Sequence, residues 1–445
     1  MAADLAIVRS PAEEALLARY PAFRARQAHW GGPSVARQRE EAFDALKARG
    51  LPNRRVEDWK YTDLRALMRE APEPFESHTR ELSVAAEAMR PVIALAEAKR
   101  ILFVNGRSVF TGRADPARDG FEYASLLAGA EPAPSLAAAL ARERPYADNA
   151  AVALNTAFMA DTVLLRVPAG TKVAQPLHLA FRELGEAPFS TYPRVLVVLE
   201  EGAELTLVET HDGPDGVAYQ TAGLVEFEIA DGARLDHVYV NAHGDAALNL
   251  WTFGVRLGRA ATIASLAMTF GAAVTRQQFF VTQAGPDARI DLRGATMLRG
   301  SQHCDSTLVV DHALPGGVSR ETFKTVLDDT ARGVFQGKIV VRQHAQKTDG
   351  RMASHALLLS EDAEADNKPE LEIFADDVQC GHGATSGALD RELLFYLKAR
   401  GIPAKEAEAL LIQAFLGEAV EGVAHEGLRE ALMAPVAAWL AARSR

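Results

Sequence analysis

Cysteine is almost absent from this chain, since only Cys304 and Cys380 occur among its 445 residues. Two cysteines cannot build a disulfide framework, and their scarcity points to a reducing compartment. Long apolar runs are missing as well: none approaches the ~20 residues that a membrane span requires. The first residues contain Asp4 and only a short apolar patch, unlike a signal peptide. These absences predict a soluble protein located in the cytoplasm.

Concentrated positive charge is a third absence. The chain has 59 Asp and Glu residues against 48 Lys and Arg, a net charge of −11. An acidic surface repels nucleic acid and anionic membranes unless a basic patch overrides it. The pair Arg54 and Arg55 forms no such patch, because Glu57 and Asp58 follow at once. We therefore expect neither nucleic acid nor a membrane among the partners.

The motifs of self-contained enzymes are also missing. Gly337 and Lys338 stand outside any Gly-x-x-x-x-Gly-Lys-Ser/Thr loop, so we expect this chain to bind no nucleotide itself. A Gly-x-Ser-x-Gly elbow does not occur, and His425-Glu426 lacks the second histidine of a zinc-protease helix. The sequence thus predicts a non-catalytic protein.

Three regions follow one another along the chain. Residues 1–95 carry helix signals, such as a serine cap followed by Pro11 and two acids. Residues 96–385 contain many short β-branched runs and form a predicted β core with a helix or loop lead-in. Residues 386–445 return to helix, beginning at a predicted N-cap, Asp390. We expect a mainly β fold with helical flanks.

A glycine turn followed by an alternating strand recurs through the central region. The turn glycines lie 32, 30, 26 and 27 residues apart, at Gly170, Gly202, Gly232, Gly258 and Gly285. This interval is typical of stacked β coils, none of which can bury its inner face alone. We favour a solenoid-like β-helix core. A β-sandwich, which also has closely spaced turns, is the alternative.

The segment most informative about function contains Cys380-Gly-His382-Gly-Ala-Thr385. In an extended backbone, residues i and i+2 project from the same face, so thiolate and imidazole could reach one soft or borderline metal ion. A structural zinc site needs four protein ligands and a catalytic one about three. Cys380 and His382 therefore form half of a site. The alternative is that they are a small buried hydrophobe and a hydrogen-bonded turn residue.

Two further groups are weaker candidates. Asp376 and Asp377 would face opposite sides of a strand, so a turn or edge role is the better interpretation. The run His303-Cys304-Asp305, with Asp311-His312 downstream, holds possible metal ligands. Consecutive strand residues alternate faces, however, so only a subset of them could converge.

Several blocks together resemble the SufB/SufD family of iron–sulfur cluster assembly scaffolds. The most specific blocks are residues 368–385 and 389–402, and shorter matches occur at residues 55–62, 155–158, 312–315, 345–350 and 357–360. No cysteine precedes Cys304, and Cys-Gly-His-Gly stands where SufB carries a glutamate-flanked histidine. Both features favour the SufD branch. Members of that branch often have serine where this chain has Gly381, a change that leaves both metal donors in place.

The resemblance implies N-terminal helices, a β-helix core and a C-terminal helical region. It also implies a complex with SufB and the ABC-type ATPase SufC, in which a cluster forms at the SufB–SufD interface. By position, His382 would be the main ligand for iron or a transient, nascent cluster shared with SufB, and Cys380 a second ligand. The ATPase would dock on the helices between Asp390 and about Val423.

Other functions stay open on the sequence. A β-helix carbohydrate enzyme would need converging carboxylates and usually an extracellular location, and the chain shows neither. A purely architectural subunit would hold SufB and the ATPase without binding metal. The isolated chain could also form a homodimer, because an exposed sheet edge favours pairing.

Overall fold

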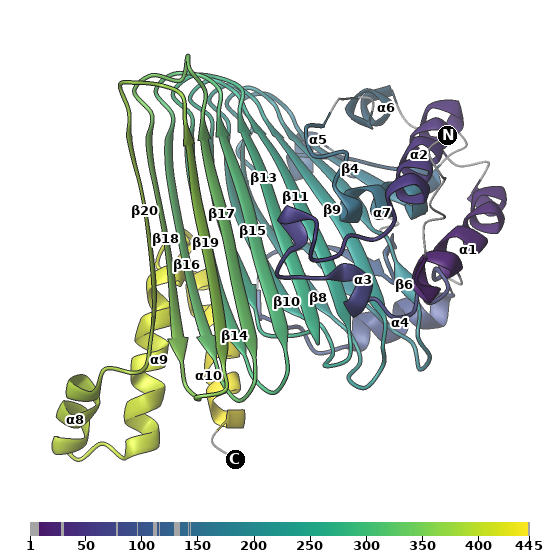
Figure 1. Ribbon diagram of the computed structural model, residues 1–445. Helices are drawn as coiled ribbons and strands as arrows, with labels where there is room; N and C mark the ends of the chain where they lie inside the picture. The colour runs from purple at the N-terminus through teal and green to yellow at the C-terminus, as the bar shows by residue number, and fades with distance from the viewer. Residues whose placement is uncertain are drawn as a thin grey trace, which may run out of the picture.

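The computed structural model describes residues 9–27, 31–76, 79–95, 97–109, 114, 116–128, 134–140, 142 and 144–443. Two long sheets face each other and form the body of the molecule (Figure 1). The N-terminal helices gather at the end formed by the earlier strands, while the opposite end of the sheets ends in open strands. The mainly β fold with helical flanks is therefore confirmed.

The two sheets contain the strands in a regular order. The first sheet runs β2 (Arg107–Ser108), β1 (Lys99–Val104), β5 (Leu177–Arg182), β8 (Glu204–Asp212), β10 (Arg234–Ala242), β12 (Thr262–Thr269), β14 (Arg289–Leu298), β16 (Val318–Leu327), β18 (Asp349–Leu358) and β20 (Gln379–Gly387). The second runs β19 (Glu364–Ile373), β17 (Arg332–Val341), β15 (His303–His312), β13 (Val274–Gln283), β11 (Leu248–Leu257), β9 (Gln220–Ile229), β7 (Arg194–Leu199), β4 (Thr162–Val167) and β3 (Glu122–Ser125), with β6 (Ser190–Thr191) beside β9.

Successive strands alternate between the two sheets, so the chain winds into a solenoid of about eight coils. Neighbouring strands within each sheet are parallel, except for the pairs β1–β2 and β3–β4. A β-sandwich is built from antiparallel sheets, so this parallel pairing excludes the alternative. The strands β1 to β3 lie within the predicted lead-in and extend the sheets at their N-terminal end.

The recurring glycines form a ladder of stacked turns. The backbone N–H of Gly170 donates to Glu201, that of Gly202 to Asp231, and that of Gly232 to Arg259, over 2.8–2.9 Å. All three glycines have φ of +66°, a backbone conformation that residues with a side chain rarely adopt. Each coil thus places its turn on the next, which explains the sequence period.

The longest helices, of 17 or 18 residues, lie at the two ends of the chain, two at each end. The helices are α1 (Pro11–Gln27), α2 (Gly32–Arg49), η1 (Glu57–Trp59), α3 (Leu64–Leu67), α4 (Arg80–Ala88), α5 (Pro116–Asp119), η2 (Leu126–Ala128), α6 (Pro134–Leu140), α7 (Ala150–Phe158), α8 (Arg391–Ala399), α9 (Ala404–Val420) and α10 (Glu426–Arg443). Asp390 caps α8 as predicted, accepting hydrogen bonds from the two following N–H groups at Glu392 and Leu393.

Helices α9 and α10 cover the outer face of the first sheet. Ile412 and Leu416 of α9 and Leu432 of α10 are fully buried against outward-facing residues such as Val238 and Leu266. Helix α8 does not join this layer and projects beyond the body (Figure 1). None of the helices in the described ranges is long and apolar enough to span a membrane.

Candidate metal site at the open end of the solenoid

Cys380 and His382 lie on the last strand, β20, and face the interior of the solenoid. In the parallel register, Cys380 stands beside Gly350 and His382 beside Met352. Met352 is buried in the core between the sheets, so residues in register with it point inward. The prediction that the two donors share one face is confirmed. They lie near the start of β20, after a turn at 374–378 that follows β19.

The two side chains differ in exposure because no further coil covers β20. Cys380 is half-buried against the core, while His382 is exposed. Burial raises the pKa of the Cys380 thiol, a hydrogen bond with the Gly350 backbone opposes the rise, and the charges of Asp349 and Glu321 add to it. A metal ion binding here must therefore displace the thiol proton.

No third donor joins Cys380 and His382. Within the described ranges, no group of three or more His, Cys, Asp or Glu side chains is arranged to hold a metal ion. Edge strands such as β19 and β20 can pair with another chain through their outer backbone groups. Beside them, Ile373 and Phe374 are 41% and 59% exposed. This end of the solenoid therefore exposes two strand edges and an apolar pair beside Cys380 and His382.

The weaker candidate ligands do not converge. Cys304 is buried inside the solenoid, whereas His303 and Asp305 face outward and both contact Thr62. His312 is buried, with its two ring nitrogens engaged by Gln283 and Ser319 at 2.9 and 3.0 Å. These residues therefore hold separate parts of the fold together.

The carboxylates at 376 and 377 occupy a turn. Asp377 pairs with Lys347 of the coil below, and its backbone N–H donates to Gln346 over 2.9 Å. Both residues are exposed. The turn role predicted for them is confirmed.

Comparison with known proteins decides the family. The model described as "SUF system FeS cluster assembly, SufBD core domain" matches residues 181–415, and the SufBD protein N-terminal region matches residues 11–179. The chain belongs to the SufBD family. It is 31% identical over 417 residues to the iron–sulfur cluster assembly protein SufD of Escherichia coli (strain K12), covering 91% of this chain and 93% of the relative. A SufBD family protein of Synechocystis is 30% identical over 403 residues, 87% of each chain.

The family's N-terminal block at residues 55–62 is a strap across the outer face of the second sheet. The Trp59 ring is buried beneath the guanidinium of Arg276, 4.0 Å from the ring centre. Arg276 donates to the Asp58 carbonyl over 2.6 Å and pairs with Asp305 over 2.5 Å. Lys368 of the edge strand β19 pairs with Glu57 over 2.6 Å. The strap thus contacts three strands, β13, β15 and β19, and reaches the open end, although these strands are more than 200 residues away in sequence.

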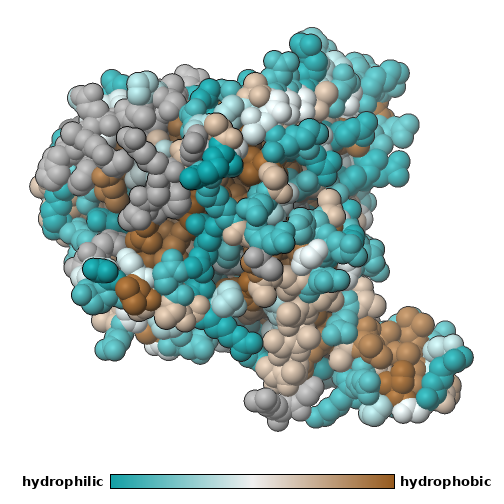
Figure 2. Space-filling view, turned by 180° about the vertical axis from the view of Figure 1, so that it is seen from behind, coloured by the Kyte–Doolittle hydropathy of each residue, from teal (hydrophilic) through white to brown (hydrophobic). Residues whose placement is uncertain are grey.

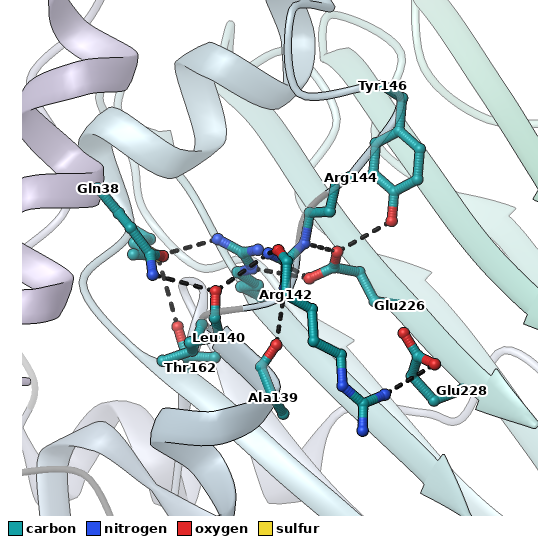
Figure 3. Close-up of polar contacts among 11 residues, drawn as sticks. Gln38, Ala139, Leu140, Arg142, Arg144, Tyr146, Thr162, Glu226 and Glu228 are labelled. Atoms are coloured by element: carbon teal, nitrogen blue, oxygen red, sulfur yellow. Dashed lines mark hydrogen bonds and ion pairs between the residues drawn. The ribbon is translucent and has the colours of Figure 1, made fainter.

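A second polar cluster fastens the segment after α6 to the body. Glu226 accepts from Tyr146 over 2.9 Å and from Arg194 over 2.8 Å, and it also pairs with Arg144 (Figure 3). Burial alone would raise the pKa of Glu226, but the guanidinium groups of Arg194 and Arg144 lower it to about 2. Arg144 further donates to the carbonyls of Leu140 and Ala139. Because Arg144 and Arg194 are already engaged by Glu226, and Arg144 also by backbone carbonyls, we interpret the cluster as structural: it holds this segment against the sheet.

Glu321 is an inward-facing acid near the open end, and no sequence motif marks it. Its side chain is almost fully buried on β16, and neither carboxyl oxygen has a hydrogen-bond partner among the described residues. Burial raises the pKa of Glu321 to about 8, and Ser319 and Arg320 oppose the rise only in part. Glu321 is therefore mostly protonated at neutral pH.

Glu321 should make the protein less stable as pH rises. The unfolded side chain ionises near its ordinary pKa of 4.5, while the folded one holds its proton to about 8. Stability from this group is thus fully present below the lower value and is lost as pH rises through the higher one. Relative to wild type, Glu321→Gln should gain roughly 4–5 kcal/mol of stability as the pH rises between these limits. Urea unfolding of both proteins across this pH range measures their free energies of unfolding. A difference between the two proteins that stays constant with pH would contradict the prediction.

Proposed function

We propose that this chain is a scaffold subunit of a SUF iron–sulfur cluster assembly complex. It pairs through its open end with a cysteine-richer SufB chain and carries the ABC-type ATPase SufC on its C-terminal helices. The observation that carries the proposal is the placement of Cys380 and His382 on the inner face of an uncovered last coil. The membership in the SufBD family supports the same role. The chain itself would bind no nucleotide and catalyse no reaction.

The substrate of the proposed site is ferrous iron or a nascent cluster. Imidazole suits iron and thiolate suits a cluster, so His382 is the main ligand and Cys380 the second. Both donors bind metal only when deprotonated, so acid opposes binding. The exposed apolar residues Ile373 and Phe374 beside the edge strands give the partner chain an anchor.

The surface proposed for the ATPase is the apolar face of α8. Leu393, Phe395 and Tyr396 are 51%, 73% and 52% exposed, an unusual density for one short helix. Figure 2 shows a brown, hydrophobic patch on the small lobe at the lower right, where α8 lies. Contiguous exposed apolar patches on soluble proteins mark interaction sites. ATP-driven dimerisation of two bound ATPase subunits would pull on these helices and open the seam at which iron enters.

Replacing Phe395 by aspartate should weaken ATPase binding at least about thirtyfold, because a buried aromatic anchor contributes some 2 kcal/mol or more to an interface. The fold should be unaffected, since the side chain is exposed. Val84→Asp on α4 is the matched control, because Val84 is an apolar residue 61% exposed in the N-terminal region. Binding of the purified ATPase, measured by calorimetry, should fall for Phe395→Asp alone. Equal affinities would contradict this docking surface.

Anaerobic purification of the chain from its native cells, with iron and sulfide assayed on the eluate, tests the complex. We expect an ABC ATPase and a cysteine-richer paralogue to co-elute with iron. If the same partners co-elute and the iron content of the eluate is the same for the His382→Ala variant, the chain is an architectural subunit only. If neither partner co-elutes and the chain elutes as a homodimer, the proposed complex is wrong.

A further inference from the structure

Glu321 is the only acid that faces the interior in the last three coils, all of which lie in the described part of the chain. Along the first sheet, Leu292, Glu321, Met352 and His382 stand in register on four successive strands. One step to the side, Ser319, Gly350 and Cys380 form a second inward column. Glu321 is therefore two strand spacings, about 10 Å, inside His382, with Met352 between them.

The column that holds Cys380 lies beside the column that holds Glu321. Gly350 has no side chain between Ser319 and Cys380, and the Ser319 hydroxyl and the Ile339 side chain close the space around it, 3.4 and 3.5 Å from where a methyl group would lie. The Ser319 hydroxyl is engaged by His312 over 3.0 Å. Glu321 and Cys380 therefore lie on the same inner face, in neighbouring columns of the first sheet.

No opposite charge in the interior neutralises Glu321 when it ionises. The side chains in register with it are Leu292 and Met352, and the inward residues of the facing strand β17 nearest the open end are apolar. Its charged neighbours are Arg320 and Asp291. Arg320 pairs with Asp349 over 2.6 Å, and Asp291 pairs with Arg293 over 2.9 Å. An unpartnered buried acid is costly, so its presence needs a compensating role.

We propose that Glu321 is a charge-compensating residue for the open end: it loses its proton to solvent when a divalent metal ion binds at Cys380 and His382, and its carboxylate then stabilises the bound ion. The inference rests on the proposed function. Glu321 does not ligate the metal, because Met352 separates it from His382. It acts through charge in the chain alone, because its side chain is almost fully buried inside the solenoid.

The expected size of the effect follows from Coulomb's law. Two unit charges about 10 Å apart, in an effective dielectric constant of about 20, change an affinity by roughly tenfold. In the metal-free protein the Glu321 carboxyl keeps its proton up to about pH 8, so the gain in metal affinity from its charge depends on pH. Removing the carboxylate should therefore weaken binding by roughly tenfold near pH 8.5 but only about twofold near pH 7.

The test is a titration of the full-length chain with Co²⁺, read by the thiolate-to-metal charge-transfer absorption that reports Cys380. The variants are Glu321→Gln, which removes the charge, and Glu321→Asp, which keeps it. Glu183→Gln is the matched control, because Glu183 is equally buried, has a pKa raised by burial to about 8, and lies just after β5, far from the open end. His382→Ala tests the site itself.

We expect Glu321→Gln to weaken Co²⁺ binding with the stated pH dependence, while Glu321→Asp and Glu183→Gln bind as wild type. If Glu321→Gln binds normally at both pH values but His382→Ala does not bind, the role of Glu321 is overturned and the site stands. If Glu183→Gln weakens binding equally, the effect is not local and the proposal is overturned. If wild type shows no Cys380-dependent absorption, both the proposed site and the role of Glu321 fail.

Discussion

Replacing His382 by alanine is expected to remove iron from the purified complex while leaving its protein partners bound. The imidazole is one of the two metal donors proposed on the inner face of β20. It is exposed and makes no hydrogen bond or ion pair within the described residues, so the fold does not depend on it. Loss of a direct ligand should reduce bound iron at least tenfold, because removing a residue that only hydrogen-bonds to a metal ligand already lowers metal affinity about tenfold or more.

His355→Ala is the control for this experiment. His355 lies one strand inward, on β18, and its ring contacts Thr385 of β20 over 2.7 Å on the outer face of the sheet. The same substitution there removes an imidazole near the open end without touching the inward donors. Iron and sulfide assays on both anaerobic eluates should differ. Normal iron content in His382→Ala would rule out His382 as a ligand and leave an architectural subunit.

Replacing Asp305 by alanine should lower the free energy of unfolding by about 3–5 kcal/mol, because it leaves a buried guanidinium unpaired. Asp305 and Arg276 are both fully buried, and the carboxylate also accepts from Thr62 and Gln336. Its loss should release the strap as well. Urea unfolding measures the free energy, and protection of the Trp59 ring from solvent, followed by fluorescence, measures the strap.

Asp311→Ala on the same strand is the matched control. Asp311 pairs with Arg342 at the surface, where the arginine side chain is 56% exposed. Exposed pairs contribute about 0–1 kcal/mol, so this variant should be nearly as stable as wild type. The double variant Arg276→Met/Asp305→Leu should lose less than Asp305→Ala, because no charge is then left buried. Equal stabilities for Asp305→Ala and Asp311→Ala would mean that the strap does not depend on this pair.

Local patterns in the sequence predicted much of the fold. A glycine with positive φ stands in the turn of three successive coils, at Gly170, Gly202 and Gly232, so the glycine period marked the coils before any contact was known. The cap at Asp390 and the stop at Gly401, where φ is +87°, bounded α8 in the same way. The shared face of Cys380 and His382 follows from the two-residue repeat of a strand. Each of these rests on neighbours in the chain.

The rest depends on register and on long-range contact. Glu321 looks like any strand acid in the sequence, and a shift of one residue would have placed it in solvent. The strap at residues 55–62 was recognisable as a family block, but its docking on Arg276 and Asp305 joins segments more than 200 residues apart. Neither a propensity nor a period encodes such a pairing.

The sequence by itself determined the solenoid, the helical flanks and the pair of donors, because turns, caps and strand alternation are local. Only the tertiary structure decided that the last coil is uncovered, that Cys380 is half-buried while His382 is exposed, and that Glu321 lies behind them. Exposure and charge at a site depend on which coils stack above and below it. That stacking is a property of the whole chain, and it leaves Cys380 and His382 together on the inner face of the last strand, beside the open end.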